Sequence, residues 1–181
     1  MTTHIAMLRG INVTGHNVIR MEALRAAFAA LGFKNVKTYI QSGNVIFETD
    51  EPATGLSAKI QKAILKKFGF EVPVLTKTAD EMAEIVKRNP FATDTALDQK
   101  KLYVTFLSDD PRANAGELLK PLAANGERFH VVGRAVYGCF PNGYGETKLS
   151  NTAIEKKLSC GATTRNWNTT RTLLEMTRGK R

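Results

Sequence analysis

The stretch that decides the fold is residues 37–49, which read KTYIQSGNVIFET. Residues 37–41 and 44–49 each read as a strand, and Ser42-Gly43 between them reads as a two-residue turn. Two strands joined by such a turn form a β-hairpin. The rest of the chain is interpreted outward from this hairpin.

A helix and a strand flank the hairpin on each side. Apolar residues at helical spacing predict helices over residues 21–31 and 56–68, each followed by a glycine. Residues 5–8 form the first strand and residues 72–76 the last, with Pro73 inside it. Because proline cannot donate a ladder hydrogen bond, this last strand belongs at a sheet edge. The order β-α-β-β-α-β is that of the ferredoxin-like fold, whose fourth strand lies at an edge.

The remainder reads as a second copy of this order. It predicts a helix over 80–88, a strand over 102–107, a short helix near 118–122, a hairpin of 127–132 and 134–140, and helices over 151–158 and 164–177. In this half a helix takes the place of the last strand. We therefore expect an α+β fold of two ferredoxin-like halves packed together, residues 1–78 and 79–181, the second lacking its last strand and ending in helices.

Composition limits the kind of protein. The 181 residues are 43% hydrophobic and 24% charged, which suits a folded globular chain. No apolar run approaches membrane-span length, and the N-terminus lacks the parts of a signal peptide. We therefore expect a cytoplasmic protein with no membrane partner. The two cysteines, Cys139 and Cys160, and the three histidines lack metal-ligand spacing, so we expect no metal. We expect no disulfide in a reducing cytoplasm, and no cofactor.

The charge is strongly positive. The net charge is +9, and residues 121–181 hold 10 basic and 4 acidic side chains. This balance favours anionic partners such as nucleic acid, nucleotides or phosphate esters, while a merely solvated basic surface is the alternative.

Two polar clusters stand out. Residues 162–170, ATTRNWNTT, read as the first turn of the last helix, with Thr163 or Thr164 as N-cap and Arg165 in that turn. A cation is unfavourable there unless an anion or carboxylate lies nearby. Residues 9–17, RGINVTGHN, follow the first strand. They lack the Gly-Lys-Ser/Thr of a P-loop, but a strand, loop and helix N-terminus can bind an anion through backbone N–H groups.

Both clusters also have an architectural interpretation. Glycine and asparagine supply positive φ angles to loops, and amides beside a tight turn hold it together. Arg165 can pair with Glu155 or Glu146 instead of a ligand. The candidates for ligand or anion binding are Arg9, Asn12, Asn17, Gln41, Asn44, Lys148, Arg165, Asn166 and Asn168.

Several stretches together resemble a known family. They include LRGINV (8–13), TYIQSGNV (38–45) and ATTRNWNT (162–169), with shorter ones at 21–25, 31–33, 89–91, 148–151 and 154–156. In this order they resemble the bacterial family DUF1697, a domain of unknown function. The resemblance implies two ferredoxin-like halves packed together. It implies no activity, so it assigns no catalytic residue.

The function expected from these features is binding. We expect a non-catalytic protein that binds an anionic partner, nucleic acid or a nucleotide. One alternative is an enzyme or sensor for a small phosphate- or carboxylate-bearing metabolite, with a pocket lined by Arg9, Asn12, Arg165 and Asn166. Another is a protein-interaction module that assembles through a free strand edge. No nucleophile elbow or zinc motif supports catalysis, but sites assembled from distant residues leave an enzyme open.

Overall fold

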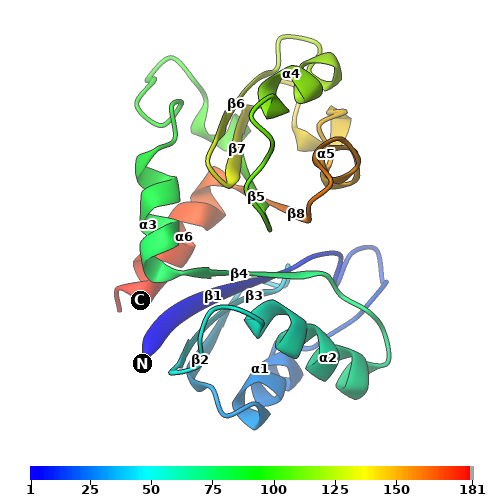
Figure 1. Cartoon of the computed structure of the whole chain (residues 1–181), viewed down its shortest axis with the longest axis vertical. Coiled ribbons are helices and arrows are strands. Elements are labelled where there is room, and N and C mark those ends of the chain that lie inside the picture. Colours follow the sequence, from blue (N-terminus) through cyan, green and yellow to red (C-terminus); the bar gives the residue numbers. More distant parts are fainter. Residues whose placement is uncertain (180–181) are drawn as a thin grey trace. The chain divides into compact units, whose positions relative to one another are not determined.

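The computed structural model describes residues 1–179 and divides into two compact units (Figure 1). The first unit is Met1–Ala83 together with the chain from Leu173 onward, and the second is Glu84–Thr172. Each unit holds one four-stranded antiparallel sheet. The chain is thus a mixed α+β protein, with six α-helices in the residues described.

The elements of the first unit follow the predicted order. They are β1 (Thr2–Leu8), α1 (Met21–Ala30), β2 (Lys34–Tyr39), β3 (Asn44–Thr49), α2 (Leu56–Phe68) and β4 (Val74–Thr78). The strand order is β2-β3-β1-β4, so the prediction that the fourth strand lies at an edge is confirmed. Pro73 precedes β4 rather than lying inside it, which leaves the ladder with β1 intact from Leu8 to His4.

The core of the first unit lies between its sheet and two helices. Alternate residues of each strand face α1 and α2, because successive side chains of a strand point to opposite faces. The buried side chains that meet there include Ala6, Leu8, Val45, Phe47, Leu24, Phe28, Ile60 and Ile64. Gly32 and Gly69 follow the two helices with φ angles of 87° and 82°, the left-handed conformation that ends a helix.

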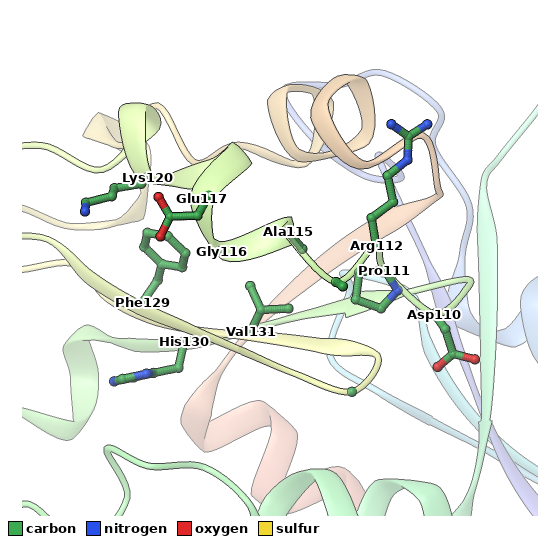
Figure 2. A pocket seen from close by; sticks show the side chains of 12 residues that line it. Asp110, Pro111, Arg112, Ala115, Gly116, Glu117, Lys120, Phe129, His130 and Val131 are labelled. Carbon is green, nitrogen blue, oxygen red and sulfur yellow. The ribbon is translucent and has the colours of Figure 1, made fainter.

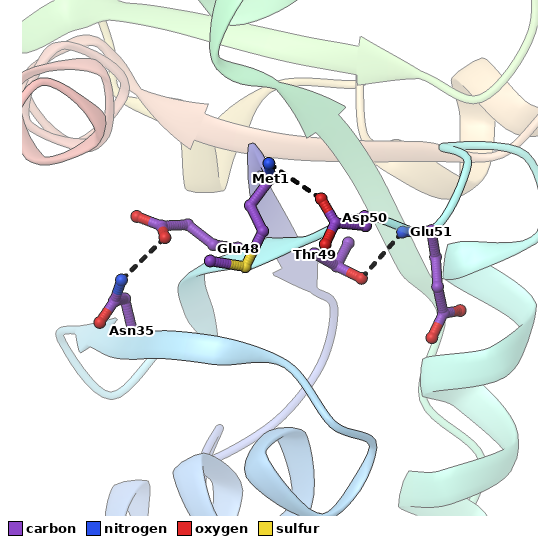
Figure 3. Close-up of polar contacts among 6 residues, drawn as sticks. All are labelled: Met1, Asn35, Glu48, Thr49, Asp50 and Glu51. Carbon is purple, nitrogen blue, oxygen red and sulfur yellow. Dashed lines mark hydrogen bonds and ion pairs between the residues drawn. The ribbon is translucent and has the colours of Figure 1, made fainter.

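Polar contacts link the starts of β1 and β2 to the end of β3 (Figure 3). The Met1 ammonium lies 2.9 Å from a carboxylate oxygen of Asp50. Asn35 has a φ of 50° at an irregularity in the pairing of β2 with β3, and its side-chain amide donates to Glu48 at 2.7 Å. This bulge bends the edge strand β2.

The second unit has one strand more than predicted. Its elements include β5 (Leu102–Leu107), α4 (Ala115–Leu119), β6 (Arg128–Val132), β7 (Ala135–Cys139), α5 (Asn151–Leu158) and β8 (Ala162–Asn166), with single 3-10 turns η1 (Gln99–Lys101), η2 (Lys120–Leu122) and η3 (Tyr144–Glu146). The strand order is β6-β7-β5-β8. The prediction that this half lacks its last strand is therefore wrong.

The error lies in residues 162–166, which we expected to open the last helix. They pair with β5, from Leu107 opposite Ala162 to Tyr103 opposite Asn166. Thr163 and Arg165 are buried while Asn166 is exposed. Two adjacent β-branched threonines favour a strand, and pairing supplies the backbone hydrogen bonds that a helix start would lack. The last helix, α6 (Trp167–Thr177), begins only after this strand.

The second core repeats the arrangement of the first. Buried side chains of the sheet, among them Leu107, Val136 and Ala162, pack with Leu119 of α4 and with Ile154 and Leu158 of α5. Ser150 caps α5 by accepting a hydrogen bond from the Ala153 N–H at 3.2 Å. The remaining helix, α3 (Ala79–Lys87), begins with a capping box in which Thr78 and Glu81 each accept from the other's backbone N–H.

Candidate functional site

The loop after β1 is held by one asparagine. The Asn12 side-chain amide donates to the carbonyl oxygens of Ile19 (3.0 Å) and Gln41 (2.8 Å), and its oxygen accepts from the Ile19 N–H at 2.8 Å. Asn12 has a φ of 53°, which asparagine tolerates better than most residues. Asn12 thus ties the loop both to the start of α1 and to the β2–β3 turn.

The other candidates of the first unit also make hydrogen bonds within it. Asn17 donates to the Gly10 carbonyl at 3.1 Å, and Asn44 donates to the Tyr39 carbonyl at 3.2 Å and to the Ser42 hydroxyl at 3.1 Å. Arg9 is half-buried, and its backbone N–H donates to Pro73. Gln41 has an exposed side chain. These amides hold the loop and the turn, which is the architectural role considered for them.

Arg165 occupies a different place from the predicted one. It lies on β8, is only 9% exposed, and donates to the Thr164 carbonyl at 2.9 Å and the Thr163 hydroxyl at 3.2 Å. Burial lowers the pKa of Arg165 to about 10, so its guanidinium still carries its charge at neutral pH. The prediction that Arg165 stands in the first turn of the last helix is wrong.

Asn166 takes the position that was predicted for Thr163 or Thr164. Its side-chain oxygen accepts from the Thr169 N–H at 2.7 Å, which caps the start of α6. Asn168 follows in the first turn with an exposed side chain. The polar cluster therefore does surround a helix start, but one that begins three residues later than predicted.

A pocket of about 420 Å³ opens at this helix start. It is lined by Gln99, Lys100, Asn166, Trp167, Asn168 and Arg171. Lys100 comes from η1, just before β5, and Arg171 lies three residues after Asn168 on α6. Both cations are exposed, and within residues 1–179 neither forms an ion pair with a carboxylate. Trp167 is 4% exposed and belongs to the wall of the pocket, not to an open stacking surface.

The pocket combines two cations with three side-chain amides. The start of α6 adds the positive end of its dipole, which attracts negative charge. The carboxylate nearest to Lys100 in sequence, that of Asp98, accepts a hydrogen bond from the Lys100 backbone N–H at 2.9 Å. The arrangement suits a phosphate or carboxylate, with the amides of Gln99 and Asn168 and the NH2 group of Asn166 available for neighbouring polar groups of the same ligand.

The sequence interpretation found two of the six lining residues. It named Asn166 and Asn168 but missed Gln99, Lys100 and Arg171. Arg171 had a usable signal, because residues three apart on a helix share a face and Asn168 was already a candidate. Gln99 and Lys100 had no such signal, since they precede α6 by more than 60 residues.

Lys148 does not line this pocket. It is exposed on the segment between η3 and α5. Tyr144 and Asn151, which are close to Lys148 in sequence, both bond to Thr164. The Thr164 hydroxyl donates to the Asn151 side-chain oxygen (2.7 Å), accepts from the Tyr144 hydroxyl (3.0 Å) and lies 2.7 Å from the Thr105 hydroxyl. This network joins β5, β8, η3 and α5 and has an architectural role.

Two features bear on cofactors and membranes. In the described part of the chain no group of three or more His, Cys, Asp or Glu side chains is placed to hold a metal ion, and both cysteines are free thiols. Over the same residues no helix is both long and apolar enough to cross a bilayer.

Comparisons with known proteins give a family but no activity. A search of curated proteins found no match. Among solved structures, the conserved bacterial protein SP0830 from Streptococcus pneumoniae is similar, with a TM-score of 0.76 and 21% identity over 97% of this chain and 98% of that one. At that identity the likeness supports the fold alone. Residues 1–137 match the family described as "Protein of unknown function (DUF1697)", and the chain belongs to that family.

Proposed function

We propose that this chain is a non-catalytic binding protein for an anionic partner, and that the partner is nucleic acid. The observation that carries the proposal is the pocket at the start of α6, where Lys100 and Arg171 stand beside the amides of Gln99, Asn166 and Asn168. The net charge of +9, concentrated in residues 121–181, supports the same class of partner.

The side chains divide into two tasks. Lysine and arginine bind phosphate through charge and hydrogen bonds, and this part of the binding free energy does not depend on the nucleic-acid sequence. Amide side chains hydrogen-bond base edges and sugar hydroxyls. Because Trp167 is buried, base stacking on an exposed tryptophan is not part of the proposal. Phosphate contacts therefore supply most of the affinity.

The test is a titration of fluorescent single- and double-stranded oligonucleotides at several salt concentrations. The logarithm of the binding constant should fall linearly with the logarithm of salt concentration. Lys100→Ala/Arg171→Ala should weaken binding and reduce the magnitude of that slope by about 2 on duplex DNA, because two phosphate contacts are lost.

The matched control is Lys156→Ala/Lys157→Ala, which removes the same charge from exposed positions on α5. It should leave most of the affinity intact. Equal losses in the two double variants would show that charge alone, and not this pocket, attracts the oligonucleotide. No binding at low salt would overturn the proposal.

The pocket volume supports a second candidate. At about 420 Å³ it lies in the range of small-molecule sites, so a phosphate- or carboxylate-bearing metabolite is the alternative partner, bound by an enzyme or a sensor. Inorganic phosphate should then raise the melting temperature by mass action, and Lys100→Ala/Arg171→Ala should abolish that rise. A rise with phosphate but no oligonucleotide binding would favour this candidate.

Two further assignments belong to the proposal. We assign both units to the ferredoxin-like fold, supported by the strand orders β2-β3-β1-β4 and β6-β7-β5-β8. We place the protein in the cytoplasm, where nucleic acid and nucleotides are available. Fractionation of cells that express the native protein tests the second assignment.

A further inference from the structure

The second unit has an open sheet edge beside a groove. β6 is the terminal strand of the order β6-β7-β5-β8. A groove of about 690 Å³ runs beside it and is lined by Phe129, His130, Val131 and Gly133 on the strand side and by residues of 110–120 on the α4 side. Figure 2 shows the Phe129 and Val131 side chains pointing from β6 toward α4.

The direction of the β6 backbone groups follows from its neighbours. The Leu107 N–H donates to Arg134 and the Phe140 N–H donates to Lys101, so the even-numbered residues of β7 face β5. The odd-numbered ones face β6, where their partners are Arg128, His130 and Val132. The backbone N–H and C=O groups of Phe129 and Val131 therefore point away from β7, and within the described residues they form no backbone hydrogen bond.

This edge has fewer protections against pairing than the edge strands of the first unit. Edge strands are commonly protected by a bulge, a proline, a short length or charged side chains, lysine above all. β2 of the first unit has a bulge between Lys34 and Lys37, and Pro73 directly precedes β4. The five residues of β6, RFHVV, contain no proline or lysine, and its register with β7 is unbroken; Arg128 at its first position is its one arginine or lysine.

We propose that β6 is an interaction surface for a second copy of this chain, paired antiparallel through β6 across a two-fold axis at His130. In that register Phe129 of each copy lies opposite Val131 of the other, and both residues contribute their outward backbone groups, giving four hydrogen bonds. The axis brings the two His130 residues together as a non-hydrogen-bonded pair, about 4.5 Å apart between Cα atoms. An isologous contact of this kind closes as a dimer.

The edge is self-complementary, which favours a second copy as its occupant, because the outward residues Phe129 and Val131 lie symmetrically about His130. The register sets Arg128 opposite Val132, so no like charges face each other within the paired strands. The copy also brings apolar Phe129 and Val131 to the face on which the groove opens. The groove itself carries both signs of charge, since Arg112, Glu117 and Lys120 line it, and Asp110 at its wall pairs with Arg134 at 2.9 Å.

The experiment measures association by sedimentation or light scattering over a range of protein concentrations. The native chain should show a monomer–dimer equilibrium. Because each copy carries +9, added salt should strengthen association by screening repulsion between the copies. His130→Lys and His130→Glu should each be monomeric, since like charges then meet at the axis, and an equimolar mixture should form heterodimers.

The matched controls are Thr152→Lys and Thr152→Glu, which place the same charges at an exposed position of α5 and should leave the dimer intact. A native chain that stays monomeric at every concentration overturns the proposal, as does a dimer that persists in both His130 variants. The His130 ring centroid lies 5.2 Å from that of Phe91, so the charged variants need a melting curve as evidence of folding.

If they do not fold, His130→Cys decides. Facing non-hydrogen-bonded residues meet the Cα spacing of a disulfide, so oxidation should give a covalent dimer above the background set by the native thiols. A cross-linked dimer supports the pairing, and its absence overturns it.

Discussion

Replacement of Asn12 tests whether the loop after β1 is architecture or a ligand site. Asn12→Ala removes three hydrogen bonds, two from the amide to the Ile19 and Gln41 carbonyls and one accepted from the Ile19 N–H. At a net value of about 0.5–1.5 kcal/mol each, their loss should lower the free energy of unfolding by about 2–4 kcal/mol. Alanine at a φ of 53° adds roughly 1 kcal/mol of backbone strain.

A second substitution separates these two contributions. Asn12→Gly loses the same hydrogen bonds but adopts the positive φ without strain. It should be less destabilising than Asn12→Ala by about 1 kcal/mol. The matched control is Asn17→Ala, which has a φ of 48° but loses only one exposed hydrogen bond, to Gly10 at 3.1 Å. It should cost clearly less than Asn12→Ala.

The assay is urea unfolding followed by far-ultraviolet circular dichroism, with free energies taken by linear extrapolation. Trp167 is the only tryptophan and lies in the second unit, so its fluorescence reports that unit separately. If Asn12→Ala costs no more than Asn17→Ala, the hydrogen bonds do not hold the loop, and the ligand interpretation of residues 9–17 regains support.

Three other substitutions test specific contacts. Gly43→Ala should destabilise the chain by about 2–4 kcal/mol in urea unfolding, because Gly43 has a φ of +84° and an added Cβ would lie 2.8 Å from Leu8 and Ile11; near-native stability would contradict this. Thr164→Val should cost about 1–3 kcal/mol by removing the hydroxyl that joins Tyr144, Asn151 and Thr105, and Thr164→Ser should recover most of it. Burial lowers the pKa of His4 from its usual 6.5, against a smaller opposing effect of Glu81, so the folded state binds a proton less readily than the unfolded state. The stabilisation that comes from neutral His4 should be fully present above pH 6.5 and decrease as the pH falls below that value. His4→Phe should therefore flatten this part of a plot of melting temperature against pH, and an unchanged plot would show that another group titrates there.

Local patterns predicted most of the first unit. Helix α2 shows why, since Leu56, Ile60 and Ile64 recur at helical spacing and Gly69 ends the helix. Strand β5 and helix α5 were predicted with the bounds that the structure has. In each case the signal lies within a dozen neighbouring residues, and tertiary contacts reinforce it.

The failure at β8 has a non-local cause. Residues 162–166 carry only one aliphatic side chain, so they show no apolar alternation. The strand forms because β5 offers it a free edge, and Thr164 meets Thr105 across 59 residues of sequence. Alternate burial of Thr163 and Arg165 is visible only after that pairing is known. For the same reason the sequence did not predict Lys100 as a pocket residue, since only the pairing of β5 with β8 brings it near the start of α6.

The two proposals for the second unit make opposite demands on ionic strength. The pocket uses η1, the last residue of β8 and the start of α6, whereas the dimer uses β6 and the groove beside it, so they share no residue. Salt weakens phosphate binding because it reduces the free energy gained when counterions are released from the nucleic acid, but it strengthens association of two copies that each carry +9. A dimer also presents two pockets to one nucleic acid, so avidity raises its apparent affinity wherever both pockets reach the strand. Loss of affinity in His130→Lys but not in Thr152→Lys would then measure avidity, because neither variant touches the pocket.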